Sequence, residues 1–308
     1  MSVCFYIKNK NGFFAKKAPM TIKECLELSN RKITQFSFDE TADDFDENRF
    51  YNSSIADYEV LILGVYGQSS RGFELSFEKE ENAYEVRVCT PSTKEDWEIA
   101  LRYIKELARK LKSTISNDRE EHFSKDNIES FDYKKDILFG LECFCYDDSP
   151  SMMMPGLFRE VCLNKEYAKK FLDSQNPIES FSNFFHDIQY LDAYSAKQRF
   201  FKDKDSDEIF GLYTLTQETR TILPFKPAVE FKYTNSVKDD DVKSWKMSFC
   251  IIDGDENNPD SYHNVGMTLY SDFISHLPKD KYRFIDASHI LVEELSQDEI
   301  LELAGNKK

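Results

Sequence analysis

An acid, a hydroxyl and an imidazole lie close together in the segment Asp286-Ala-Ser-His289, and a second imidazole, His263, lies upstream. These are the residue types of a hydrolytic site, in which a histidine activates a hydroxyl nucleophile and a carboxylate orients the histidine. Such triads are assembled in space, and a serine nucleophile needs a strained turn such as Gly-x-Ser-x-Gly, which the chain lacks. Asp286, His289 and His263 are therefore catalytic candidates, and a coincidental grouping is the favoured alternative.

A second candidate is the segment Gly64-Val-Tyr-Gly-Gln-Ser-Ser-Arg-Gly72. Its backbone N–H groups, the hydroxyls of Ser69 and Ser70 and the guanidinium of Arg71 are the groups that surround a bound phosphate. The segment has no Gly-Lys-Ser/Thr ending, and no helix is expected directly after it. Ser69, Ser70 and Arg71 are candidate ligand-binding residues, but a connector between two strands is the favoured interpretation.

Two oxygen-rich segments have the residue types of cation sites. The segment from Asp253 to Pro259 resembles the start of a calcium loop, but Asn258 stands where glycine is required and Asn264 where a bidentate glutamate is required. The run from Asp39 to Asn48 is acidic, which is more typical of a solvated loop. The five histidines never fall three or four residues apart, so no helical metal pair is predicted.

The seven cysteines are an odd number and mostly lie singly in apolar segments, which favours reduced core thiols over a disulfide framework. Cys143 and Cys145 are the only close pair, within the apolar run 137–145, which we interpret as a strand. A zinc site would need a second close pair of ligands, and the chain has none. No metal and no cofactor are predicted.

The clearest structural pattern runs from Tyr58 to Ile115. An apolar run at 58–66 and alternating segments at 73–77 and 84–88 predict three strands, the last two joined by a hairpin turn. Ser92-Thr-Lys-Glu95 is a capping box that predicts the start of a helix. An apolar stripe from Trp97 to Ile115 predicts that this helix packs against the sheet by one face.

The polar segment 119–135 is the best candidate linker, which divides the chain into an N-terminal domain, 1–118, and a C-terminal domain, 136–308. In the second domain we expect helices at 157–172, 177–191 and 268–277, a three-strand meander at 198–223, and strands at 229–233, 245–252, 282–285 and 289–295. A capping box at Ser296-Gln-Asp-Glu299 predicts a closing helix. The fold class is therefore α+β, with mostly antiparallel sheets, helices packed on one face and two subdomains. Three methionines between Pro150 and Pro155 indicate either a buried loop, which we favour, or an adaptable contact surface.

The charge balance limits the partners. Lys and Arg total 40 against 56 Asp and Glu, which gives a net charge of −16. This average field repels a phosphate backbone, so nucleic acid is not predicted, and a basic protein is the more natural partner. The chain shows neither an N-terminal signal pattern nor an apolar run of membrane-spanning length, so we expect a soluble, cytoplasmic protein without membrane contact.

Three segments carry a family resemblance: Met1-Ser-Val-Cys-Phe-Tyr-Ile-Lys8, the Gly72-Phe-Glu-Leu strand, and Pro91-Ser-Thr-Lys-Glu-Asp-Trp97 before a long helix. Together they resemble a bacterial DUF4299-like family, a domain of unknown function of similar full length. The resemblance implies a bacterial cytoplasmic protein. It transfers no catalytic residue, because such families have no assigned activity.

Three functions remain open from the sequence. The first is a protein-interaction module, of the immunity or inhibitor type, that binds a basic partner. The second is a hydrolytic enzyme that uses Asp286, His289 or His263. The third is a small-molecule binding module that uses the 64–72 loop. The absence of a catalytic motif and the acidic charge favour the first.

Overall fold

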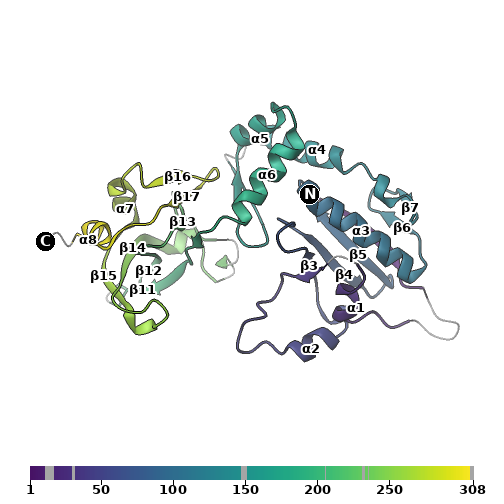
Figure 1. Ribbon diagram of the computed structural model, residues 1–308, viewed down its shortest axis with the longest axis horizontal. Coiled ribbons are helices and arrows are strands. Elements are labelled where there is room, and N and C mark those ends of the chain that lie inside the picture. The colour runs from purple at the N-terminus through teal and green to yellow at the C-terminus, as the bar shows by residue number, and fades with distance from the viewer. Residues whose placement is uncertain are drawn as a thin grey trace. The chain divides into compact units, whose positions relative to one another are not determined.

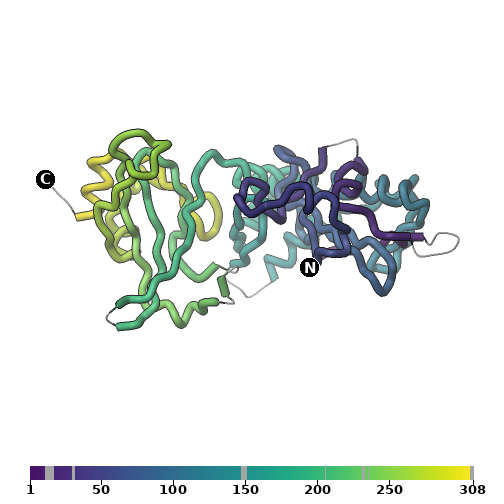
Figure 2. The backbone as a smooth tube through the Cα atoms, turned by 90° about the horizontal axis from the view of Figure 1, so that it is seen from below, coloured from purple at the N-terminus to yellow at the C-terminus, as the bar shows by residue number. Residues whose placement is uncertain are grey.

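The structure is a computed structural model that describes residues 1–10, 17–29, 32–146, 151–204, 206–230, 233–234 and 236–305. The chain forms two compact units, unit 1 from Met1 to Tyr190 and unit 2 from Leu191 to Lys308. Unit 1 runs from purple to teal and unit 2 from green to yellow in Figures 1 and 2. The α+β class, with sheets that are mostly antiparallel, is as predicted.

Unit 1 contains an antiparallel sheet in the order β2-β3-β4-β5-β1-β6-β7. Its strands are β1 (Ser2–Lys8), β2 (Thr34–Gln35), β3 (Leu61–Gly64), β4 (Phe73–Glu78), β5 (Ala83–Cys89), β6 (Ile115–Asn117) and β7 (His122–Phe123). Alternation along β1 buries Val3, Phe5 and Ile7 and leaves the residues between them partly exposed. The predicted hairpin between β4 and β5 is present, and Asn82 in its turn has φ 49°.

Helix α3 (Lys94–Leu111) covers the buried face of this sheet, and the Trp97 ring contacts Phe5 edge-on at 6.4 Å (Figure 1). Thr93 is the N-cap instead of Ser92, because its hydroxyl accepts from the backbone N–H of Asp96. The helix ends at Leu111, so Ile115 belongs to β6 and not to the helical stripe. The remaining helices of unit 1 are α1 (Ile22–Leu26), α2 (Glu47–Asn52), α4 (Tyr133–Tyr146), α5 (Lys165–Leu172) and α6 (Pro177–Gln189).

The predicted linker, 119–135, is part of unit 1. It contains β7 and a 3₁₀ turn at Ile128–Ser130 in which Ile128 is buried, and the Phe131 ring stacks on Trp97 at 5.4 Å. The contacts therefore divide the chain after Tyr190, and not within 119–135. The sequence predicted a linker because the few apolar residues of this segment that reach the core, such as Ile128 and Phe131, are scattered among exposed charged residues.

Two further expectations for this region are wrong. The run 137–145, with Cys143 and Cys145, is helix α4 and not a strand, because a short apolar run does not distinguish a strand from a packed helix. Residues 157–164 are not helical, since a short strand precedes α5. This strand, β9 (Val161–Leu163), pairs with β8 (Met152–Met154).

The methionine stretch is mostly exposed. Met152 and Met153 are each 43% exposed, and only Met154 is buried, whereas Pro150 lies outside the described residues. The favoured buried-loop interpretation therefore holds for one methionine of the three. Burial in this short strand does not alternate, because Met152 and Met154 share a strand face and only Met154 is buried.

Unit 2 contains two four-stranded sheets, in the orders β10-β13-β17-β16 and β11-β12-β14-β15. Their strands are β10 (Tyr194–Ser195), β11 (Arg199–Lys202), β12 (Ile209–Thr216), β13 (Thr221–Pro224), β14 (Val242–Ile252), β15 (Tyr262–Leu269), β16 (Tyr282–Phe284) and β17 (His289–Val292). The first hairpin of the predicted meander, β11 with β12, is present, but its third strand is wrong, because β12 pairs in parallel with β14 while β13 joins the other sheet. Residues 229–230 are not in a strand, and 231–232 lie outside the described residues.

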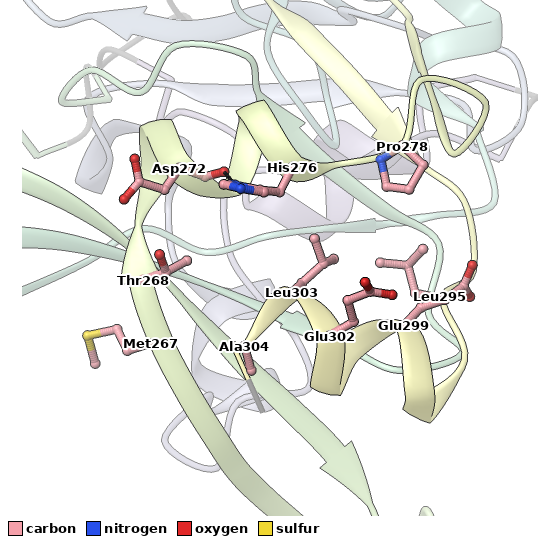
Figure 3. A pocket seen from close by; sticks show the side chains of 11 residues that line it. Met267, Thr268, Asp272, His276, Pro278, Leu295, Glu299, Glu302, Leu303 and Ala304 are labelled. Atoms are coloured by element: carbon pink, nitrogen blue, oxygen red, sulfur yellow. Dashed lines mark hydrogen bonds between the residues drawn. The ribbon is translucent and has the colours of Figure 1, made fainter. Parts of the chain in front are cut away.

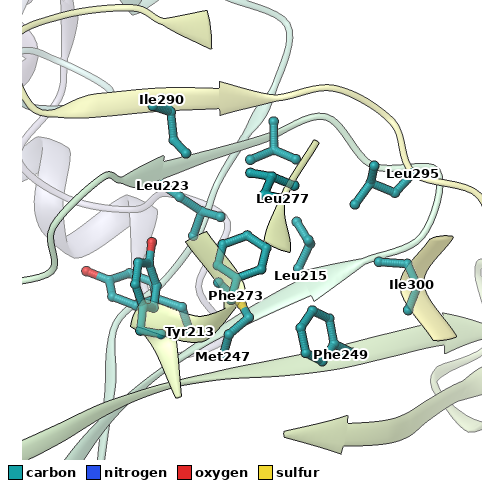
Figure 4. Close-up of a cluster of buried hydrophobic side chains, with 12 residues drawn as sticks. Tyr213, Leu215, Leu223, Met247, Phe249, Phe273, Leu277, Ile290, Leu295 and Ile300 are labelled. Carbon is teal, nitrogen blue, oxygen red and sulfur yellow. The ribbon is translucent and has the colours of Figure 1, made fainter. Parts of the chain in front are cut away.

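Helices α7 (Tyr270–His276) and α8 (Gln297–Leu303) cover one face of the β11-β12-β14-β15 sheet. Figure 4 shows the core between them: Leu215 and Phe249 of this sheet meet Phe273 of α7 and Ile300 of α8. The predicted capping box at Ser296 is present. All seven cysteines have free thiols. Among the described residues, no helix is both long enough and apolar enough to cross a membrane.

Candidate functional site

The loop between β3 and β4 turns sharply and brings three consecutive backbone N–H groups to one point. Gly72 has φ +67°, a conformation that favours glycine, and an added Cβ would clash with the backbone carbonyl oxygen of Leu63. Ser69 and Ser70 are fully buried. The convergent donors that the sequence predicted for an anion are therefore present.

The anion at this point is the carboxylate of Asp96, which is fully buried in the first turn of α3. Its Oδ1 accepts from the backbone N–H groups of Ser70 at 3.0 Å and Gly72 at 2.9 Å. Its Oδ2 accepts from the N–H of Arg71 at 2.9 Å and from the Thr93 hydroxyl at 2.7 Å. This buried carboxylate therefore accepts the hydrogen bonds of the loop's backbone N–H groups, and the acceptor comes from within the fold.

The Arg71 side chain holds the loop to neighbouring segments. Its Nε donates to the carbonyl of Pro155 at 2.9 Å, a second guanidinium nitrogen donates to the carbonyl of Pro91, and the guanidinium lies 5.8 Å from the centre of the Phe185 ring. Burial lowers the pKa of Arg71. The Ser69 hydroxyl accepts from the N–H of Val65 at 3.1 Å. The contacts of Ser69 and Arg71 are thus those of a structural connector.

Asp286, Ser288 and His289 are brought together, but in the geometry of a turn. Oδ2 of Asp286 lies 2.9 Å and the Ser288 hydroxyl 3.2 Å from the same imidazole nitrogen, Nδ1. In a catalytic relay the acid and the nucleophile contact opposite nitrogens of the ring. The other oxygen of Asp286 accepts from the N–H groups of Ser288 at 2.8 Å and His289 at 2.6 Å, which closes the turn before β17.

His263 lies elsewhere in unit 2. It is exposed on β15 and pairs across the sheet with Ile251, and no hydrogen bond within the described ranges joins it to Asp286 or His289. The segment from Asp253 to Pro259 is the hairpin loop between β14 and β15. In the part of the chain that the structure describes, no group of three or more His, Cys, Asp or Glu side chains could hold a metal ion.

A pocket of about 580 Å³ lies between β15, α7 and α8 (Figure 3). Apolar atoms come from Met267, Leu295, Leu303 and Ala304, and charge comes from Asp272, Glu299 and Glu302, with His276 beside Asp272. Asp272 and Glu302 are exposed, and the Met267 side chain on the edge strand is 46% exposed. The pocket therefore combines an apolar floor with an acidic rim.

Glu299, one of the rim carboxylates, is held by two partners. Glu299 lies 2.7 Å from Nζ of Lys281 and accepts from the backbone N–H of Ser296 at 2.8 Å. The hydrogen bond from Lys281, followed by that from Ser296, lowers the pKa of Glu299. The His276 ring donates from Nδ1 to the backbone carbonyl of Asp272 at 2.7 Å, which fixes the ring beside the pocket. The rim retains negative charge, which suits an ammonium or guanidinium group on an aliphatic stem.

A family model described as Domain of unknown function (DUF4299) matches residues 2–303. The chain belongs to this family. The match covers nearly the whole chain and confirms the resemblance that the segments at 1–8, 72–75 and 91–97 carry. Neither the search of curated proteins nor the search of solved structures gave a match for this DUF4299 protein.

Sequence reasoning missed the pocket of this DUF4299 chain, although part of its signal is local. Glu299 and Glu302 are three residues apart in α8 and so share one helical face. The capping box at Ser296 fixes the start of that helix. The convergence of α7 and the end of β15 on this face depends on tertiary packing, which local periodicity does not contain.

Proposed function

We propose that this protein is an interaction module that binds a basic polypeptide segment in the pocket between β15, α7 and α8. The observation that carries the proposal is the acidic rim over an apolar floor. The net charge of −16 supports it, because a long-range negative field accelerates the approach of a basic partner. An immunity or inhibitor-type role would use such a surface.

The expected binding mode follows from the two parts of the pocket. A lysine or arginine of the partner lays its aliphatic stem on Leu303 and Met267 and places its charge near Asp272 and Glu302. Exposed ion pairs contribute roughly 0.2–1 kcal/mol each, so the carboxylates supply charge selectivity and the apolar floor supplies much of the affinity. Binding should therefore weaken with salt but not vanish.

A direct test uses a fluorescent peptide of alternating lysine and leucine, with a glutamate–leucine peptide of equal length as the charge-reversed probe. We expect the basic peptide alone to bind. The double variant Asp272→Asn, Glu302→Gln should weaken that binding about tenfold, because two rim pairs are lost. The matched control Asp240→Asn, Glu256→Gln removes the same charge from exposed positions outside the pocket and should bind as the wild type does.

The natural partner is tested by native mass spectrometry of complexes recovered at low salt from cells that make the protein. We expect a basic protein to be retained by the wild type and by the control variant and to be lost from the pocket variant. Equal retention by all three proteins, or equal peptide binding by the pocket and control variants, would contradict the proposal.

A further inference from the structure

The β11-β12-β14-β15 sheet differs in charge from the rest of the chain. The whole protein has 56 Asp and Glu residues, yet the four strands of this sheet contain none. They contain Arg199, Lys202, Lys243 and Lys246 instead. The sheet is thus a locally basic element in an acidic protein.

The two faces of this sheet have different surroundings. Tyr213, Leu215 and Phe249 point into the core beneath α7 and α8 (Figure 4). Because side chains alternate along a strand, Thr214 and Thr216 point to the opposite face, where both are partly exposed. That opposite face is where the cationic and aromatic side chains gather.

A depression of about 490 Å³ lies on this opposite face and reaches from the sheet to β10. Lys197 and Arg199, Tyr194 and Tyr262, and Thr214 and Thr216 line it, and none of its lining residues is acidic. Tyr194 is 49% and Tyr262 43% exposed, so both aromatic side chains are accessible to a ligand. The volume lies within the range of small-molecule sites, roughly 300–1,000 Å³.

The two cations that line the depression have no ion-pair partner among the described residues. Lys197 and Arg199 are exposed, and neither makes an ion pair with any residue that the structure describes. Arg199 and Lys246 both pair with Leu212 in the sheet, and Nζ of Lys246 lies 4.0 Å from the centre of the Phe210 ring. The donors of this face are therefore open to an external anion.

We propose that this depression binds a small anionic molecule with a flat ring, of the nucleoside monophosphate class. Lys197 and Arg199 hold the phosphate, the tyrosines contact the ring, and the threonine hydroxyls bond the sugar. This site is independent of the pocket beside α8, because it uses other residues and takes the opposite charge. A nucleic-acid strand is disfavoured, since one depression provides no extended basic track and the net charge is −16.

The proposal is one of binding and includes no covalent step. Cys250 lines the depression, and burial raises the pKa of its thiol. The thiolate is the nucleophilic form of cysteine, and a raised pKa disfavours that form.

The test is calorimetric titration of the full-length protein at low ionic strength with AMP, inorganic phosphate and adenosine. We expect AMP to bind about tenfold or more tightly than either fragment, because only AMP engages the cations and the tyrosines together. Arg199→Gln and Lys197→Gln should each weaken AMP binding about tenfold. Tyr262→Leu should weaken AMP binding and leave inorganic phosphate binding unchanged.

Lys279→Gln is the matched control, because it removes the same charge from an exposed position outside the depression. Circular dichroism melting should show all four variants to be folded, since their side chains are exposed. The proposal is overturned if AMP shows no saturable binding, if Lys279→Gln weakens binding as much as Arg199→Gln, or if phosphate alone binds as tightly as AMP.

Discussion

Two regions of this protein carry groups that attract anions, and they differ in whether the fold has already supplied the anion. In unit 1 the N–H groups of Ser70, Arg71 and Gly72 all donate to the buried carboxylate of Asp96. In unit 2, Lys197 and Arg199 have no such internal partner among the described residues. Similar chemistry therefore serves stability in one region and is open to a ligand in the other.

The largest expected effect comes from removing the internal anion of unit 1, the Asp96 carboxylate. Asp96→Ala leaves the donors of the 64–72 loop and the Thr93 hydroxyl without an acceptor, and we expect unit 1 to lose about 4 kcal/mol of unfolding free energy. Chemical denaturation in a Trp245→Phe background measures this loss, because Trp97 then reports on unit 1 alone.

Asp43→Ala in the same background is the control. Asp43 is exposed in a loop, so its removal should change stability by less than about 0.5 kcal/mol. A loss below about 1 kcal/mol for Asp96→Ala would show that the carboxylate does not organise the loop.

A smaller difference in stability is expected between alanine substitutions at two glycines of the same loop, Gly67 and Gly72. Both have positive φ, but an alanine Cβ at Gly72 would clash with the Leu63 carbonyl, whereas one at Gly67 meets no atom within 4 Å. We expect Gly67→Ala to cost about 1 kcal/mol from backbone strain alone and Gly72→Ala about 3 kcal/mol. Equal costs, measured by the same denaturation, would mean that the turn relaxes around the added methyl group.

The smallest effect concerns the rim of the pocket in unit 2. The folded-state pKa of Glu299 is lowered, so its contribution to stability is present above its ordinary value of 4.5 and is lost as the pH falls through the lowered pKa. Glu299→Gln should therefore destabilise unit 2 slightly at pH 7, by less than Gly67→Ala affects unit 1. The difference from wild type should disappear in strong acid, as thermal melts across pH 2–7 would show. A difference that stays constant over this range would exclude the ion pair with Lys281 as its cause.

Local patterns predicted much of the fold. The capping box at Ser296, the hairpin turn between the strands at 73–77 and 84–88, and the stripe from Trp97 were enough to place elements, because each depends on neighbouring residues. The parallel pairing of β12 with β14 was missed because it joins segments separated by a long connection. The helix around Cys143 was missed because a short apolar run fits a buried strand and a packed helix equally well.

The sites were harder to predict than the elements. The sequence indicated that the 64–72 loop carries donors for an anion but did not identify Asp96 as their acceptor, since Asp96 has the pattern of an ordinary charge in the first turn of a helix. The pocket beside α8 and the depression that reaches β10 each combine residues from three or more elements. Their residue types are visible in the sequence, whereas their convergence is a property of packing.

The most direct test of the account is a single amide chemical-shift map of the full-length protein, recorded first with AMP and then with the lysine–leucine peptide. We predict shifts around Tyr194–Arg199 and Tyr262 with AMP, and shifts around Thr268–His276 and Glu299–Gly305 with the peptide. The amides of Ser70, Arg71 and Gly72 should not move with either probe. Shifts at those three amides, with unit 2 unchanged, would contradict the account and return the binding site to the 64–72 loop.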